Sequence, residues 1–274
     1  MKSSFLKNEA WRLLACWGLI AALMGAWASP AQAAGRWTEI QRRQRLMVCI
    51  WPEYQGISYR NPKTLQVEGV DADMAVALAS DLGVALSFVD SSFNTLAKDL
   101  QEGKCDVAMF AVGITPQRAK SMLFTAPTLF SDIYGITTKA NRIIQSWNDI
   151  DQPGVVVAVM KGTLHEPVMT ERLKQARLVV LDSRMARERE VESGRADVFM
   201  TDYPYSRIML ERVDWARLVR PDTTFHLTHY AYAVRPGEEV WLKRLNRFVE
   251  QIRRDGRLWQ AAQKYRLEEM VIRP

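Results

Sequence analysis

The chain contains few of the residues on which metal, redox and covalent chemistry usually depend. It has three cysteines and three histidines in 274 residues, and none of them falls in a C-x-x-C or H-E-x-x-H pattern. The sequence also lacks a phosphate-binding glycine loop, and no histidine accompanies a serine or cysteine nucleophile motif. These absences argue against a zinc centre, a redox dithiol and a nucleotide-binding loop. We therefore expect no metal and no cofactor.

Positive charge is too weak and too dispersed for a nucleic-acid-binding protein. The formal net charge is +6, and it falls to +4 when residues 1–33 are left out. No basic block is interleaved with aromatic residues, as nucleic-acid surfaces usually require. The charged run Arg184–Glu190 mixes both signs, which indicates the solvated face of a helix. No internal repeat is present, and we expect no nucleic-acid partner.

The first 33 residues have the pattern of a secretory signal peptide. Lys2, Lys7 and Arg12 precede an apolar run that ends near Ala28, and small residues follow it. This order of basic, apolar and small residues is typical of a cleaved export signal. Cleavage after Ala33 fits best, with cleavage after Ala28 or a retained membrane anchor as alternatives. We expect residues 1–33 to be removed and the mature protein to reside in the periplasm.

The rest of the chain alternates apolar, β-rich runs with helical patterns, which predicts α/β layers with parallel sheets. The expected strands are Leu46–Ile50, Leu86–Val89, Val107–Ala111, Val155–Val159, Leu178–Leu181 and Val198–Met200. The expected helices are Ala72–Leu82, Phe93–Glu102, His165–Ala176, Arg184–Ser193 and Val240–Tyr265, the last broken at Asp255-Gly256. About 240 residues are enough for two lobes, each with its own core.

The segment from Gly103 to Phe130 carries the clearest functional signal. An apolar strand (residues 106–111) leads into a Gly-Ile-Thr-Pro turn, and Arg118 follows on an expected helix start. Pro116 suits the first helical position, and Thr115 before it can cap the free N–H groups. A strand end, exposed N–H groups and a guanidinium therefore converge, which is a suitable site for a carboxylate.

This segment resembles the I-T-P-E-R region of the family 3 bacterial solute-binding proteins, the periplasmic receptors of polar amino acid ABC transporters. Further segments resemble the same family in the same order along the chain: Arg45–Asn61, Val67–Val84, Val157–Thr163 and Gly194–Pro204. The resemblance covers nearly all of the chain after residue 33. It implies that the protein captures a small carboxylate, most simply an amino acid, and delivers it to a membrane ABC permease. It also implies a monomer without enzyme activity.

The resemblance implies a type II periplasmic-binding-protein fold with two lobes. Lobe 1 would comprise residues 34–137 and 233–274, and lobe 2 residues 138–232. The segments Tyr134–Lys139 and Tyr230–Arg235 would be the paired hinge strands, so that the chain crosses between lobes near Thr138 and Tyr232. Closure about this hinge is the expected motion. Cys49 and Cys105 would lie on neighbouring strands, but the sequence leaves open whether they form a disulfide.

The resemblance also assigns residues to the two charges of an amino acid. Arg118 matches the family's carboxylate-binding arginine, and the N–H of Gly113 would face the same oxygens. Thr163 would donate from the other lobe, or cap the helix that starts at His165. Asp202 matches the family's ammonium-binding aspartate, although capping of the next turn is an alternative role. The backbone carbonyl of Ala111 would accept from the ammonium.

The aromatic residues Trp51, Tyr54 and Phe93 match loops that cover the ligand in this family. Aromatic rings there can stack on a ligand and shield its charges from water, although Phe93 could equally be an ordinary core residue. Met160 and Leu164 replace polar residues that are found in glutamine- or histidine-type receptors. We therefore expect a ligand with a less polar side chain, or a non-standard amino acid.

Two other functions remain open on the sequence. The N-terminal region is also similar to cyclohexadienyl dehydratases, enzymes of the same fold, which need a general acid in the pocket. Glu53 and Glu166 are the candidate carboxyl groups, with a solvated loop residue and a first-turn helix charge as the alternative interpretations. A binding module that serves a sensor or a partner enzyme is the third possibility, because fold alone does not determine function.

Overall fold

A computed structural model describes residues 35–273 of the chain. Residues 36–273 belong to one compact unit. The predicted signal peptide, residues 1–33, lies outside the described residues. Among the described residues, no helix has both the length and the apolar character that crossing a membrane requires.

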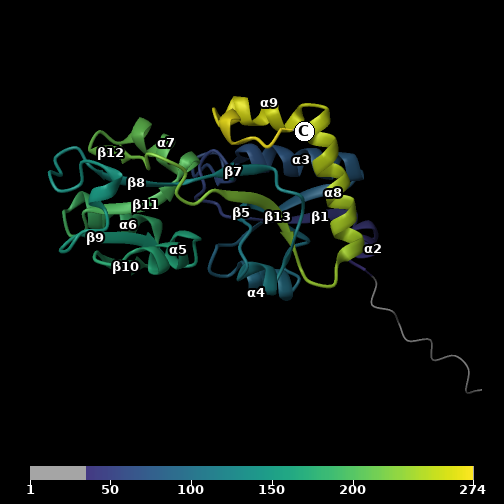
Figure 1. The fold of residues 1–274 in the computed structure, drawn as a ribbon. Coiled ribbons are helices and arrows are strands. Elements are labelled where there is room, and N and C mark those ends of the chain that lie inside the picture. The colour runs from purple at the N-terminus through teal and green to yellow at the C-terminus, as the bar shows by residue number, and fades with distance from the viewer. Residues whose placement is uncertain (1–34, 274) are drawn as a thin grey trace, which may run out of the picture. The chain divides into compact units, whose positions relative to one another are not determined.

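Two large sheets, one of six strands and one of five, organise the described residues (Figure 1). In the first sheet the order is β4 (Ala85–Asp90), β1 (Arg45–Ile50), β5 (Val107–Gly113), β13 (Thr228–Val234) and β6 (Leu123–Phe124), and β7 (Leu129–Ser131) also pairs with β13. In the second it is β10 (Arg177–Leu181), β9 (Val156–Met160), β11 (Val198–Asp202), β8 (Ile133–Thr138) and β12 (Ala216–Val219). A separate two-stranded ribbon joins β2 (Tyr59–Arg60) and β3 (Val67–Glu68).

In each sheet the first three strands are parallel, and a strand from a distant part of the chain pairs antiparallel with the third. We call the parts that carry these sheets the first half (residues 36–131 and 228–273) and the second half (residues 133–219). The predicted parallel strands are confirmed, because β1 pairs in parallel with β4 and β5, and β9 with β10 and β11. The apolar runs at β1, β5, β9 and β11 are buried almost throughout.

Helices cover both sheets, and five of the predicted segments are helical within a few residues at each end. The α-helices are α2 (Arg36–Arg43), α3 (Val70–Leu82), α4 (Leu96–Gln101), α5 (His165–Arg172), α6 (Arg184–Glu192), α7 (Tyr203–Arg212), α8 (Glu239–Arg254) and α9 (Arg257–Lys264). The short 3₁₀ turns are η1 (Arg118–Lys120), η2 (Trp147–Asp149) and η3 (Glu268–Met270). The predicted break between α8 and α9 is confirmed: Gly256 has φ +81°, which ends one helix and begins the next.

The two segments that we expected to pair as hinge strands belong to different sheets. β8 pairs with β11 and β12, whereas β13 pairs with β5, β6 and β7. Each strand is hydrogen-bonded along both edges within its own sheet, so neither has a free edge for the other. The expected pairing is therefore not observed, and the crossings lie before β8 and before β13 instead of near Thr138 and Tyr232.

A side chain joins the two crossing segments in place of strand pairing. The carboxylate of Asp132, which precedes β8, accepts hydrogen bonds from the backbone N–H groups of Phe225 (2.8 Å) and His226 (2.7 Å), which precede β13. The same carboxylate accepts from the N–H of Ile133 at 2.7 Å. Asp132 thus holds the two connections between the halves side by side.

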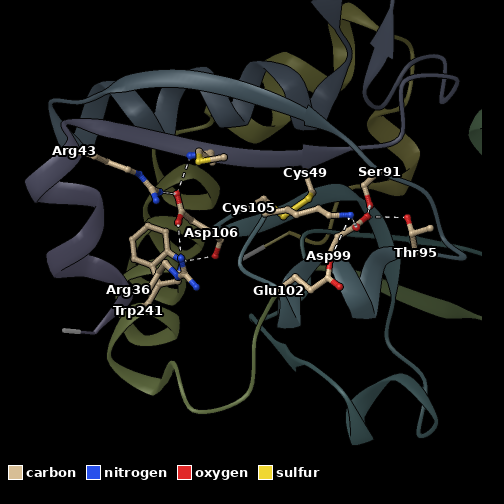
Figure 2. Close-up of a disulfide and its surroundings, with 12 residues drawn as sticks. Arg36, Arg43, Cys49, Ser91, Thr95, Asp99, Glu102, Cys105, Asp106 and Trp241 are labelled. Carbon is tan, nitrogen blue, oxygen red and sulfur yellow. Dashed lines mark hydrogen bonds and ion pairs between the residues drawn. A yellow bond between two sulfur atoms is a disulfide. The ribbon is translucent and has the colours of Figure 1, made fainter. Parts of the chain in front are cut away.

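Cys49 and Cys105, whose pairing the sequence left open, form a disulfide with their Cα atoms 5.5 Å apart (Figure 2). It ties β1 to the segment that enters β5. The adjacent Asp106 is buried, accepts from the N–H of Met47 at 2.8 Å and pairs with the guanidinium of Arg43. This end of β5 is therefore held both covalently and by charge-assisted hydrogen bonds.

We expect the double replacement of Cys49 and Cys105 by Ser to lower the free energy of unfolding by about 2–4 kcal/mol. The disulfide closes a loop with a sequence separation of 56 residues, and a bond of this span restricts the unfolded chain strongly. Urea denaturation of oxidised protein and of the double variant measures the difference. Equal stability would show that the thiols are not joined in the folded protein.

Candidate functional site

A small cavity lies where the carboxyl ends of the parallel strands of both sheets face each other. Its volume is about 30 Å³, room for roughly two water molecules. It is lined by Trp51, Tyr54, Phe93, Ala111, Arg118, Met160, Thr163, Leu164, His165, Arg187, Thr201, Asp202, Tyr205 and Tyr230. Ligands of open α/β sheets usually bind beyond the carboxyl ends of the strands.

Arg118 lies at the start of the short turn η1, directly after β5. The helix expected here is only this 3₁₀ turn, but the expected cap is present, because the N–H of Arg118 donates to Thr115 Oγ1 at 3.2 Å. Its guanidinium donates to the carbonyl of Gly113 (3.0 Å) and, in the second half, to that of Gly162 (3.1 Å). The ring of Phe93 lies 5.2 Å away. Burial lowers the pKa of Arg118 to about 10, so the group remains cationic at neutral pH.

Asp202 enters the cavity from the second half, as the last residue of β11 and the N-cap of α7. Its side chain caps the helix by accepting from the N–H of Tyr205 at 3.3 Å. It also accepts the hydroxyl hydrogens of Tyr54 and of Tyr230, the latter at 3.0 Å, and both tyrosines belong to the first half. Burial raises the pKa of Asp202 despite these bonds. Helix capping and a cavity position are therefore combined in one carboxylate.

The aromatic residues predicted to cover a ligand form one cluster. The ring of Trp51 lies 5.1 Å from that of Tyr54 and 5.3 Å from that of Phe93, both at steep angles. Phe93 also packs edge-on against Phe110 in the core of the first half, at 5.1 Å. Phe93 thus has both of the roles considered from the sequence: it packs on the core and it lines the cavity.

The backbone at Ala111 is held in an unusual conformation next to the cavity. Ala111 has φ +51°, which is uncommon for a residue other than glycine. Its N–H donates to Asp71 Oδ2 at 2.7 Å, and the other oxygen of Asp71 has no partner among the described residues. Burial raises the pKa of Asp71 to about 7, although this hydrogen bond opposes the shift. Asp71 therefore positions the end of β5, and its pKa lies near neutrality.

We expect Asp71→Asn to gain stability relative to the wild type as pH rises from 4 to 8. The pKa of Asp71 is about 7 in the folded protein, above the ordinary value of 3.8, so the folded protein keeps this carboxyl group protonated to a higher pH than the unfolded chain does. The wild type therefore loses stability as pH rises between these two values. A shift of this size corresponds to about 4 kcal/mol. Urea denaturation at pH 4.5 and 7.5 measures the change, with Asp73→Asn in the same helical turn as the control. A pH-independent difference between Asp71→Asn and wild type would contradict the assignment.

Thr163 lines the cavity but does not cap α5 with its side chain. Its hydroxyl donates to the carbonyl of Met160 at 2.7 Å, and it lies 3.3 Å from Nδ1 of the buried His165. Burial lowers the pKa of His165 to about 3, so the ring is neutral at neutral pH.

The sequence does not identify five of the lining residues as candidates: His165, Arg187, Thr201, Tyr205 and Tyr230. Arg187 is the charged one among them at neutral pH. We interpreted the run Arg184–Glu190 as a solvated helix face, but Arg187 is only 3% exposed and shares the buried face of α6 with Val191. The signal was the spacing of four between Arg187 and the apolar Val191, which places both side chains on one face. The high charge of the run concealed it.

The structure does not place every candidate residue in the cavity. Gly113 is not among the lining residues; it instead holds Arg118 through its carbonyl. Glu53 is exposed and pairs with Arg184 at 3.2 Å, and Glu166 accepts from the N–H of Gly162 at 2.7 Å. Of the carboxylates that the structure describes, Asp202 is the one that lines the cavity. Apart from Gly113, all the candidate ligand-binding residues line the cavity: Trp51, Tyr54, Phe93, Ala111, Arg118, Thr163 and Asp202.

Comparison with known proteins agrees with this architecture. The family model for bacterial extracellular solute-binding proteins, family 3, matches residues 46–268. The chain is 29% identical over 248 residues to cyclohexadienyl dehydratase of Pseudomonas aeruginosa, covering 90% of each protein. It is 24% identical over 209 residues to ABC transporter arginine-binding protein 1 of Escherichia coli K12, covering 75% of this chain and 83% of the relative.

A solved structure of related sequence has a similar fold. The crystal structure of an ancestral amino acid-binding protein, described as a precursor of cyclohexadienyl dehydratase, superimposes with a TM-score of 0.76 at 30% identity and covers 84% of this chain and 98% of that one. The fold is thus the α/β type II periplasmic-binding-protein fold that the sequence predicts. The chain belongs to family 3 of the bacterial extracellular solute-binding proteins.

Proposed function

We propose that this protein is a periplasmic receptor that binds a small carboxylate, most simply an amino acid, and delivers it to an ABC permease. The observation that carries the proposal is that Arg118 from the first half and Asp202 from the second line the same cavity. These two charges complement the carboxylate and the ammonium of a zwitterion. Trp51, Tyr54 and Phe93 would cover the ligand, and Ala111, Gly113 and Thr163 would supply or support backbone and hydroxyl contacts.

Binding would require the two halves to open and close as lobes. Four side-chain contacts join them around the cavity: Tyr54 and Tyr230 with Asp202, Arg118 with the carbonyl of Gly162, and Arg184 with Glu53. A cavity of about 30 Å³ is too small for an amino acid, so the ligand must enter a more open state and replace some of these contacts. The connections that Asp132 holds together are the proposed hinge.

Calorimetry with the twenty amino acids and simple carboxylates tests this proposal directly. We expect one chemical class to bind with a dissociation constant in the micromolar range or below, and small-angle scattering to report the change in radius of gyration on binding. A protein that binds no amino acid or carboxylate, while remaining folded, would contradict the receptor function.

A cyclohexadienyl dehydratase activity is the second candidate, favoured by the relative from P. aeruginosa. Such an enzyme needs a general acid beside the substrate ring, and Glu53 and Glu166 are the candidate carboxyl groups from the sequence. Neither Glu53 nor Glu166 lines the cavity, whereas Asp202 does. Burial raises the pKa of Asp202, which favours the protonated carboxyl group that an acid catalyst requires. An ultraviolet assay with prephenate and arogenate distinguishes the candidates. We expect no aromatic product; product formation that Asp202→Asn abolishes would favour the enzyme.

A further inference from the structure

Arg187 places a second guanidinium in the cavity that contains Arg118. The residue is 3% exposed and lines the cavity from α6, in the second half. Nη1 donates to the carbonyl of Met200 at 3.0 Å, but Nε has no hydrogen-bond partner among the described residues. A buried charged donor without a partner is costly and needs an explanation.

No carboxylate forms an ion pair with either guanidinium within 4.0 Å in the part of the chain that the structure describes. Burial lowers the pKa of Arg187, although Glu188 and Asp202 are near enough for their charges to oppose this effect. Glu188, the neighbour of Arg187 on α6, pairs with Arg184 at 3.2 Å and accepts from the hydroxyl of Tyr205. His165 is neutral, and Asp202 is the one carboxylate among the described lining residues. The lining therefore holds two positive charges and at most one negative charge.

A zwitterion with an uncharged side chain would not balance this lining, because its carboxylate and ammonium cancel. A ligand with one more acidic group would balance it, and a guanidinium suits a carboxylate because two parallel N–H groups can donate to its two oxygens. A ligand with a cationic side chain would add a third positive charge to a site of low dielectric.

We propose that the ligand carries a second acidic group, bound by Arg187, in addition to the carboxylate bound by Arg118. An acidic amino acid or a related dicarboxylate is the corresponding chemical class. This inference rests on the proposed function and refines its substrate class. It also replaces our expectation of a less polar ligand side chain, which considered Met160 and Leu164 but not Arg187.

Arg187 also has contacts that a purely structural role would explain. Its guanidinium lies 4.4 Å from the ring centre of Phe199 and 4.9 Å from that of Tyr205. Such stacking stabilises a buried arginine without any ligand. The test must therefore measure a preference for charge, which a structural role would not produce.

The experiment is calorimetry on the purified protein with acid and amide pairs of equal size. We compare glutamate with glutamine and aspartate with asparagine, and we add 2-aminoadipate, glutarate and arginine. In the wild type we expect at least one acidic ligand to bind about tenfold or more tightly than its amide, and arginine to bind weakly or not at all. Amides or arginine that bind as tightly as the acids would overturn the inference.

The variant Arg187→Met should weaken binding of the preferred acid by roughly thirtyfold, because the acidic group then lacks its partner. Binding of the matching amide should change only a few-fold. Arg189→Met, at an exposed position of the same helix, is the control and should bind as the wild type. An unchanged acid preference in folded Arg187→Met would refute the role of Arg187.

The outcomes separate this inference from the proposed function. If neutral amino acids bind without an acid preference and Arg118→Ala abolishes that binding, the receptor function stands and the inference fails. If no ligand binds to the wild type, both fail. If Arg187→Met does not fold, the comparison of acids with amides in the wild type still decides.

Discussion

Replacement of Arg118 by Ala should weaken ligand binding by roughly thirtyfold or more. Removing one partner of a buried ionic hydrogen bond typically costs about 2–5 kcal/mol, and 1.4 kcal/mol corresponds to a tenfold change in affinity. Arg118 meets the conditions for such an effect. Its guanidinium lines the cavity and is fixed by the carbonyls of Gly113 and Gly162, at 3.0 and 3.1 Å, with no carboxylate paired to it among the described residues.

Calorimetry with the best ligand measures this change, and Arg118→Lys shows how much depends on geometry. Lysine keeps the charge but not the planar pair of donors, so we expect intermediate affinity. Lys120, two residues further along η1 and exposed, provides the control Lys120→Ala, which should bind as the wild type. Unchanged affinity in folded Arg118→Ala would remove Arg118 from the site and the receptor proposal with it.

Replacement of Asp202 by Asn should separate recognition of the ammonium from recognition of the carboxylate. The variant keeps an oxygen to accept from the N–H of Tyr205, and asparagine is as good an N-cap as aspartate, so α7 should persist. It loses the negative charge, and an amino acid ligand should bind roughly thirtyfold or more weakly. A ligand of the same carbon skeleton without the amino group should lose only a few-fold.

Calorimetry with glutamate and glutarate makes this comparison directly. Tyr54→Phe is the companion variant, because it removes the hydroxyl that donates to Asp202 from the first half but keeps the ring. Should both ligands weaken equally in Asp202→Asn, the carboxylate would hold the tyrosines Tyr54 and Tyr230 and not a ligand ammonium. A wild type that binds glutarate more tightly than every amino acid would lead to the same conclusion.

Local patterns in the sequence were sufficient for the elements that determine the fold. The apolar runs at β1, β5, β9 and β11 predict buried parallel strands because a strand covered on both faces needs apolar residues throughout. The turn after β5 identifies Arg118 as a ligand-binding candidate, and the strand end before Pro204 does the same for Asp202. Both residues lie in the cavity because the carboxyl ends of parallel strands meet at one edge of a sheet.

Only the tertiary structure decided the contacts that join distant segments. The strands β8 and β13 have similar β-rich patterns, and nothing in those patterns shows that each is hydrogen-bonded on both edges within a different sheet. The tie between the crossings depends on one side chain, Asp132, which reaches residues more than ninety positions away.

The cavity residues also differ in whether local sequence patterns or tertiary packing places them there. The sequence by itself determined the family, the α/β class and two charged residues of the cavity, Arg118 and Asp202, because these depend on short motifs at strand ends. The burial of Arg187 depends on how α6 rotates against its sheet, and the bond between Cys49 and Cys105 depends on how β1 approaches the start of β5. Such relations are set by packing between elements, which local spacing does not encode.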